Sequence, residues 1–202
     1  MRFVVISPES ADPREVRAIE GFFGAGLESY HVRKPSWTSD ALESWLRLLP
    51  REWRPRIVLH QHRPLAGRLG LGGTHDRDDG DTPAPPGCSR SCHAIASLRR
   101  HLPRYGSLFF GPVFASLTKP GYGPAPGFPW DDLRSVLRSR TSAEARVLAI
   151  GGVTAAGLGR CRELGFDGAA VLGAVWNEQD PVAAYVAIRD AAARLEGARH
   201  AA

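Results

Sequence analysis

Short apolar runs alternate with segments of helical periodicity along the whole chain. The runs are rich in β-branched, aromatic and small residues, which is typical of strands that are buried on both faces. The predicted strands are Phe3–Ile6, Ser29–Val32, Ile57–His60, Leu71–Thr74, Ser89–Cys92, Ser107–Phe110, Val147–Ile150 and Ala169–Leu172.

Amphipathic segments between these runs predict helices. Residues 39–49 place Leu42, Trp45 and Leu46 on one face at helical spacing. Asp12 followed by Pro13 is a typical helix start, because proline is tolerated at the first helical position. The predicted helices are Pro13–Gly24, Ser39–Leu49, His93–Leu102, Trp130–Arg138, Thr154–Leu164 and Pro181–Leu195.

Eight strands joined by helices or loops predict an α/β fold, a single-domain (β/α)₈ TIM barrel over residues 1–202. The chain is shorter than a typical barrel, so we expect some abbreviated helices. One of them is expected at residues 62–68, which contain Pro64 and Gly67. The segment 76–87 is rich in Asp, Gly and Pro and predicts a loop.

Composition and charge argue against several classes of function and location. The formal net charge is +5, but the arginines are spread along the chain among acidic residues. This pattern disfavours nucleic acid and suits anionic small molecules. No run reaches the roughly 18 apolar residues of a membrane span, and the first residues lack a signal-peptide cleavage site. We therefore expect a cytoplasmic protein with no membrane partner.

Only two lysines occur, and each follows a predicted strand. Lys119 lies in a loop with Ser116 and Thr118, where an ammonium group, hydroxyls and backbone N–H groups suit a phosphate. Residues that follow the strands of a barrel meet at one mouth. The sequence therefore predicts two anion sites there: Arg33, Lys34, Ser91, Thr118 and Lys119 at one, and Gly152 and Gly173, next to Gly151 and Ala174, at the other.

Histidines also follow neighbouring strands. His60 and His62 are spaced so that both side chains can point the same way, and His31, His75 and Asp76 end adjacent strands. Such a group could hold zinc for a hydrolytic reaction. Alternatively, these histidines are hydrogen-bonding residues of the barrel wall.

Several motifs resemble the thiamine phosphate synthase / thiazole tautomerase (TenI-like) superfamily, in order and spacing over nearly the whole chain. They are Ser91-Cys92-His93, Gly111-Pro112-Val113-Phe114, Ser116-Leu117-Thr118-Lys119, Ala149-Ile150-Gly151-Gly152-Val153 and Gly168-Ala169-Ala170-Val171-Leu172-Gly173. The resemblance implies a barrel that can form a homodimer. It also implies that the partners of the protein are phosphorylated small molecules. In the synthase branch, a pyrimidine diphosphate loses diphosphate with the help of Mg²⁺ and is captured by thiazole phosphate.

The resemblance also implies residue roles. Arg33, Lys34, Ser91 and Lys119 would be catalytic, and Asp78 and Asp79 would hold the metal. Substrate would be bound by His31, His60, His62, His93, Ser116, Thr118, Gly151, Gly152, Gly173 and Ala174. His31 replaces a family glutamine, and Lys34 comes one residue earlier than the family lysine. The alternatives are a thiazole phosphate tautomerase, a binder of thiazole or thiamine phosphates without turnover, and the metal-dependent hydrolase.

Overall fold

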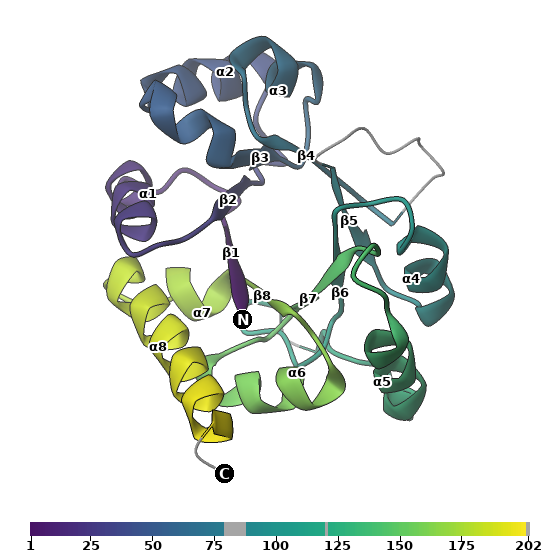
Figure 1. The fold of residues 1–202 in the computed structure, drawn as a ribbon. Coiled ribbons are helices and arrows are strands. Elements are labelled where there is room, and N and C mark those ends of the chain that lie inside the picture. Colours follow the sequence, from purple (N-terminus) through teal and green to yellow (C-terminus); the bar gives the residue numbers. More distant parts are fainter. Residues whose placement is uncertain (79–87, 120, 201–202) are drawn as a thin grey trace.

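The chain forms a closed barrel of eight parallel strands, each paired with its neighbours in chain order (Figure 1). The computed structural model describes residues 1–78, 88–119 and 121–200. The strands are β1 (Arg2–Ile6), β2 (Ser29–Val32), β3 (Ile57–Leu59), β4 (Gly73–Asp76), β5 (Ser89–Cys92), β6 (Ser107–Phe110), β7 (Arg146–Ile150) and β8 (Gly168–Val171). Pairing of β1 with β8 closes the barrel, with Val4 opposite Ala170. The predicted (β/α)₈ barrel is confirmed.

Helices surround the barrel on its outer side (Figure 1). They are α1 (Glu15–Gly24), α2 (Ser39–Leu48), α3 (Pro64–Leu69), α4 (Ile95–His101), α5 (Trp130–Ser139), α6 (Leu158–Leu164), α7 (Gly173–Trp176) and α8 (Pro181–His200), with 3₁₀ turns at Arg51–Arg56 and Ala155–Gly157. The abbreviated helix predicted near Pro64 is α3. Within the described residues, no helix has both the length and the apolar character that crossing a bilayer requires.

The fourth strand begins two residues later than the sequence predicts. Gly70 ends α3 in the left-handed conformation, with φ of 66°. The N–H of Gly72 then donates to the carbonyl oxygens of Arg54 and Ile57. A Cβ on Gly72 would lie 2.2 Å from the Pro55 oxygen, so only glycine allows this approach. Leu71 and Gly72 therefore form the turn into β4 and are not its first residues.

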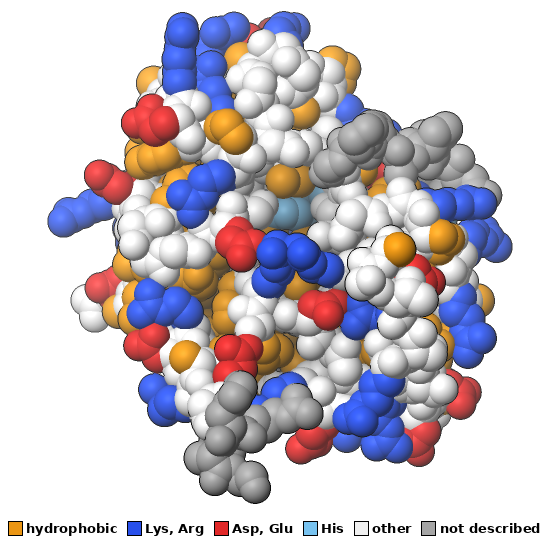
Figure 2. Space-filling model, in the orientation of Figure 1, with side chains coloured by type: hydrophobic (Ala, Val, Ile, Leu, Met, Phe, Trp, Pro, Cys, Tyr) orange, Lys and Arg blue, Asp and Glu red, His pale blue; other side chains and the backbone are white. Residues whose placement is uncertain are grey.

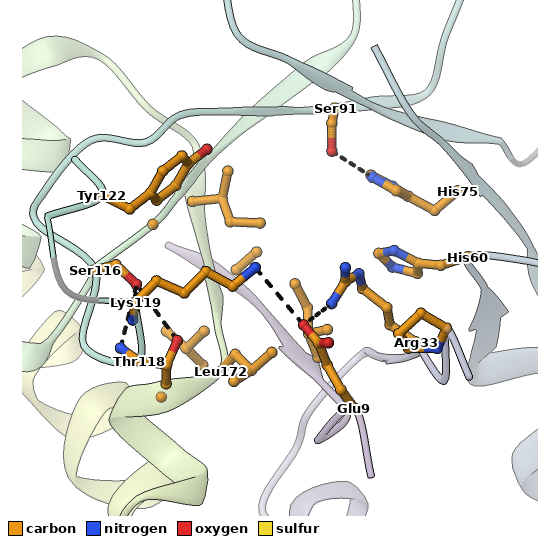
Figure 3. A pocket seen from close by; sticks show the side chains of 18 of the residues that line it. Glu9, Arg33, His60, His75, Ser91, Ser116, Thr118, Lys119, Tyr122 and Leu172 are labelled. Carbon is orange, nitrogen blue, oxygen red and sulfur yellow. Dashed lines mark hydrogen bonds and ion pairs between the residues drawn. The ribbon is translucent and has the colours of Figure 1, made fainter. Parts of the chain in front are cut away.

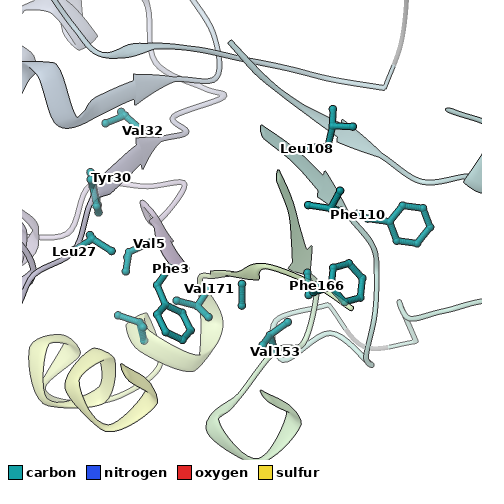
Figure 4. Packing of buried hydrophobic residues seen from close by; sticks show 14 of the residues in the cluster. Phe3, Val5, Leu27, Tyr30, Val32, Leu108, Phe110, Val153, Phe166 and Val171 are labelled. Atoms are coloured by element: carbon teal, nitrogen blue, oxygen red, sulfur yellow. The ribbon is translucent and has the colours of Figure 1, made fainter. Parts of the chain in front are cut away.

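Alternation along the strands divides the buried residues into two layers. Residues such as Val5, Tyr30 and Phe110 belong to the large core between the strands and the helices (Figure 4). The residues that alternate with these along each strand point into the barrel, because successive side chains of a strand face opposite sides of the sheet. On β1, β6, β7 and β8 these inward residues are apolar: Val4, Ile6, Phe109, Leu148 and Ala170, with Ile150 and Leu172 partly buried above them.

Most inward positions of β2 to β5 are polar instead, with Val58 of β3 as an apolar exception. His31 lies on β2, His60 directly follows β3, His75 lies on β4, and Ser89 and Ser91 lie on β5. His31, His75 and Ser89 are buried. One half of the barrel interior is therefore an ordinary aliphatic and aromatic core, whereas the other half consists mainly of imidazole and hydroxyl groups.

Candidate functional site

A cavity of about 760 Å³ lies at the carboxyl ends of the strands, the face on which the side chains that follow each strand converge. Figure 2, in the orientation of Figure 1, shows the opposite face, with the N-terminus of the chain toward the viewer; a histidine side chain is visible in the hollow at its centre, with basic and acidic side chains beside it. Residues at the carboxyl ends of all eight strands, or in the loops that follow them, line the cavity. Its wall includes thirteen predicted site residues: Arg33, His60, His62, Asp78, Ser91, His93, Ser116, Thr118, Lys119, Gly151, Gly152, Gly173 and Ala174.

Two cations face each other across this cavity and share one carboxylate. Arg33, after β2, forms an ion pair with Glu9, which follows β1. The Nζ of Lys119 lies 4.0 Å from the Oε1 of the same Glu9 (Figure 3). Glu9 and Lys119 are exposed, whereas Arg33 is partly buried. The positions of Arg33 and Lys119 therefore suit an anionic group lying between them.

The loop after β6 holds Lys119 through its own hydrogen bonds. The Oγ of Ser116 accepts from the backbone N–H of Lys119 at 3.0 Å and from that of Thr118 at 3.3 Å (Figure 3). The N–H of Ser116 in turn donates to the carbonyl oxygen of Tyr122 at 2.7 Å. Ser116 therefore organises the turn that presents Thr118 and Lys119 to the cavity.

Glycines allow this loop to pack against the end of β7. The N–H groups of Val113 and Phe114 donate to the carbonyl oxygens of Ile150 and Gly151. Gly152 has φ of 65°, and a Cβ there would lie 2.0 Å from the Ala115 oxygen. Close backbone approach thus requires glycine at position 152, whatever ligand the cavity takes.

The same wall exposes backbone to a ligand. Gly151 and Gly152 line the cavity after β7, and Gly173 and Ala174 line it at the start of α7. A Cβ on Gly173 would lie 3.0 Å from the Cγ2 of Thr118, so this turn packs directly on the β6 loop. Because these positions carry little or no side chain, a bound group meets backbone there.

The opposite wall contains two stacked histidines. The rings of His60 and His75 have centroids 4.2 Å apart (Figure 3). The Nε2 of His75 lies 2.8 Å from the Oγ of Ser91, and its Nδ1 lies 2.8 Å from the Oγ of Ser89. Burial, aided by the positive charges of Arg33 and Arg90, lowers the pKa of His75 to about 3. His75 is therefore a neutral imidazole at physiological pH.

Burial has the same effect on the other two inward histidines. It lowers the pKa of His31 and of His60 well below the ordinary range, and neighbouring histidines add to the effect. The Nδ1 of His31 and the Nε2 of His60 are 3.1 Å apart. His31 lies in the barrel interior below His60 and does not form part of the described cavity wall. Its predicted contact with substrate is therefore not supported by its position.

The prediction that Lys34 belongs to the mouth is wrong. Lys34 is fully buried, and its Nζ lies 2.6 Å from Glu15 Oε2. It also donates to the carbonyl oxygens of Pro8 and Ser10, each at 2.8 Å. Alternation explains the position: His31 and Arg33 point toward the barrel axis, so Lys34 points toward α1 and α2. Lys34 ties the end of β1 to α1 and leaves the mouth to Arg33.

The zinc site predicted from His31, His60, His62, His75 and Asp76 is only partly assembled, because His62 and Asp76 lie away from the other three residues. The Nε2 of His62 lies 2.9 Å from the carbonyl oxygen of Trp37. Asp76 faces the outer side of β4, where it pairs with Arg63 and accepts from the hydroxyl of Tyr105 at 3.1 Å.

Asp78 lines the cavity, and Asp79 lies outside the described residues. One Asp78 oxygen accepts from the backbone N–H of His93 at 2.8 Å, and the other accepts from the hydroxyl of Ser97. Each carboxylate oxygen keeps a second lone pair. Mg²⁺ in proteins commonly uses one or two carboxylates, with waters and substrate phosphates completing its shell. Asp78 and Glu9 are carboxylates of the cavity lining, and carboxylate oxygen is the ligand type that this ion prefers.

The sequence reasoning missed Glu9. The signal was available, because Ser7, Pro8 and Glu9 directly follow β1 and the ends of all eight strands meet at the mouth. Tyr122 and Trp37, which also line the cavity, gave no comparable signal, because both lie in loops whose course depends on tertiary contacts.

The curated proteins that the chain resembles in sequence share one name. No family model matches the chain. A thiamine-phosphate synthase from Chromobacterium violaceum is 33% identical over 63% of this chain and 63% of that protein. One from Bordetella bronchiseptica is 30% identical, with 89% of each chain covered.

Solved structures agree with this result. The structure of thiamine phosphate pyrophosphorylase from Bacteroides thetaiotaomicron has a TM-score of 0.78 and 25% identity, covering 95% of this chain and 98% of that one. A protein of the same name from Pyrococcus furiosus has a TM-score of 0.75 at 19% identity, covering 94% of each chain, which shows the shared fold.

Proposed function

The chain belongs to the thiamine-phosphate synthase family, and we propose that it couples an aminopyrimidine methyl diphosphate to a thiazole phosphate. The bond between the pyrimidine methylene carbon and the diphosphate oxygen breaks, and the bonding pair leaves with diphosphate. The thiazole nitrogen then donates its lone pair to that carbon. The products are thiamine phosphate and diphosphate.

The observation that carries this proposal is the placement of Arg33 and Lys119 on either side of Glu9. Departure of diphosphate concentrates negative charge on the leaving oxygens, and preorganised cations and hydrogen-bond donors lower the cost of that charge. In the proposal, Arg33 and Lys119 bind the diphosphate, and the hydroxyls of Ser91 and Thr118 donate to it. Lys34, buried against Glu15, has no part in this step.

The glycine wall takes the second substrate. We assign the thiazole phosphate to the backbone at Gly152 and Gly173, with Gly151 and Ala174 beside it. Both substrates then lie in one cavity, so that the reaction at the methylene carbon occurs within a single complex.

Asp78 and Glu9 would hold Mg²⁺, which supplies positive charge to the leaving diphosphate when bound. Waters and substrate phosphate oxygens would complete the octahedral shell of the ion around these carboxylates. Without a diphosphate, Glu9 instead pairs with Arg33 and Lys119. The thiazole phosphate tautomerase is not favoured, because the relatives are named as synthases.

The experiment is a coupling assay with both phosphorylated precursors and Mg²⁺, with thiamine phosphate separated and quantified. We expect product that depends on both precursors, and a large loss of turnover in Lys119→Ala. Arg134→Ala is the matched control, since Arg134 is an exposed cation on α5 whose partner is Asp131. Binding of both precursors without product, at high protein concentration, would identify a binder and refute the synthase.

A further inference from the structure

Three histidines from consecutive strands meet at the floor of the cavity. One ring nitrogen from each of His31, His60 and His75 lies within 4.8 Å of one nitrogen of the other two. The cluster is backed by Phe109, whose ring centroid is 5.0 Å from that of His31 and 4.6 Å from that of His75. We propose that His31, His60 and His75 form a binding site for a divalent transition metal of the zinc class.

The ligand set suits such an ion. Imidazole nitrogen is a preferred ligand of zinc, copper and nickel, whereas Mg²⁺ prefers oxygen. A neutral ring offers a lone pair, and burial keeps all three rings neutral. Three imidazoles with one open position are also a known ligand set for zinc. The site is therefore chemically distinct from the carboxylates Asp78 and Glu9.

The spacing requires little rearrangement. Zinc–nitrogen bonds of about 2.0–2.1 Å at tetrahedral angles place two ligand nitrogens roughly 3.3 Å apart. The Nδ1 of His31 and the Nε2 of His60 are already 3.1 Å apart. The third nitrogen lies within 4.8 Å of the other two, so it must approach by at most about 1.5 Å to reach the spacing of zinc ligands, and a rotation of the His75 ring would supply this shift.

Ser89 would act as the outer partner of His75. Its Oγ lies 2.8 Å from the Nδ1 of His75, and a hydrogen-bonded outer partner commonly fixes the tautomer of a metal-binding histidine. The Nε2 of His75 is then the coordinating atom. The Ser91 hydroxyl lies 2.8 Å from this Nε2, and the ion would take the place of that hydroxyl.

The ion's fourth position would face the cavity. His60 and His75 line the cavity, whereas His31 lies below them. Three neutral rings leave the ion its full charge, and Arg33 lies close enough to His60 and His75 to affect both electrostatically. We therefore expect an anionic fourth ligand, such as hydroxide or a phosphate oxygen.

The test is a cobalt titration of protein without a histidine tag, stripped of metal and free of substrates. We expect about one equivalent of Co²⁺ with the visible absorption of a nitrogen-ligated ion, displaced by Zn²⁺ but not by excess Mg²⁺. His75→Gln should weaken binding roughly tenfold or more. His62→Gln is the matched control, because His62 shares the cavity wall but pairs with the Trp37 carbonyl, and it should bind as the unaltered protein does.

A second measurement needs no variant. Zinc added to the unaltered protein should shift the ring ¹⁵N signals of three histidines, assigned as His31, His60 and His75, and leave those of His62 and His93 in place. Absence of stoichiometric Co²⁺ binding, or equal binding by His75→Gln and the unaltered protein, would overturn the proposal. Because no substrate is present, neither outcome bears on the coupling reaction.

Discussion

The two lysines should separate cleanly into one structural and one functional residue. Lys34 is fully buried and binds three acceptors: Glu15 Oε2 at 2.6 Å and the carbonyl oxygens of Pro8 and Ser10 at 2.8 Å. Lys34→Met keeps the length of the side chain but removes the charge. The Glu15 carboxylate then remains buried with Tyr30 as its hydrogen-bond donor, at 2.8 Å.

The expected loss follows from this geometry. Removing one partner of a buried ion pair typically costs about 3–5 kcal/mol, because the other charge stays buried without compensation. For a chain of this size, each kcal/mol lowers the melting temperature by roughly 2–4 °C. We therefore expect Lys34→Met to melt roughly 10 °C below the unaltered protein. The double variant Lys34→Met/Glu15→Gln should recover part of the loss, because it removes the isolated charge.

Urea unfolding followed by circular dichroism measures the free energy, with Lys119→Met as the matched variant. The Lys119 side chain is 63% exposed, so its replacement should change the unfolding free energy by less than about 0.5 kcal/mol. That variant should instead weaken binding of free diphosphate. If Lys34→Met unfolds like the unaltered protein but loses turnover as Lys119→Met does, the structural assignment of Lys34 is refuted.

Three further predictions concern the mouth and the barrel interior. Glu9→Gln should bind free diphosphate roughly two- to fivefold more tightly in calorimetry without divalent ions, since exposed ion pairs contribute about 0.2–1 kcal/mol each; unchanged affinity would exclude competition by Glu9. Gly152→Ala should raise the KM for thiazole phosphate and lower the melting temperature, because its Cβ would lie 2.0 Å from the Ala115 oxygen; an unchanged KM would contradict the packing described. Burial lowers the pKa of His75 from 6.5 to about 3, so between these pH values the unfolded chain binds more protons at this group than the folded chain does. The free energy of unfolding therefore falls as the pH falls, by up to about 1.4 kcal/mol per pH unit for this group. Urea unfolding with chelator at pH 7, 6 and 5 should show a shallower loss in His75→Gln, and equal slopes would contradict the assignment.

Much of the fold could be predicted from the sequence because most strands are short apolar runs between turn signals, although β4 and β5 are polar. The register of the turn before β4 could not, since it depends on the contact of Gly72 with the backbone of Pro55. No local pattern in the sequence indicates that contact.

Residues of the candidate site could be predicted where the alternation of side chains between the two faces of a strand was taken into account. Placing residues at strand ends brought Arg33, Ser91 and Lys119 to the mouth. The same period of two would have turned Lys34 outward, but its position directly after a strand placed it in the predicted anion site. The partnership of Lys34 with Glu15 required knowledge of how α1 packs on the barrel, which lies beyond sequence patterns.

The histidines show the opposite case. Their presence at successive strand ends was visible in the sequence, but the pairing of His60 with His62 was the wrong choice. The backbone of His62 has φ of 54°, so the chain leaves strand geometry there and the alternation that would align the two side chains no longer applies. The inward neighbours across the sheet, His31 and His75, are the residues that His60 meets.

The central claim is that this cavity joins two phosphorylated substrates. The most direct measurement quantifies thiamine phosphate and released diphosphate together, in one reaction with both precursors and Mg²⁺. The account predicts that the two products appear in a one-to-one ratio and that omission of either precursor abolishes thiamine phosphate. Diphosphate release without thiamine phosphate, or no product from protein that binds both precursors, would contradict it.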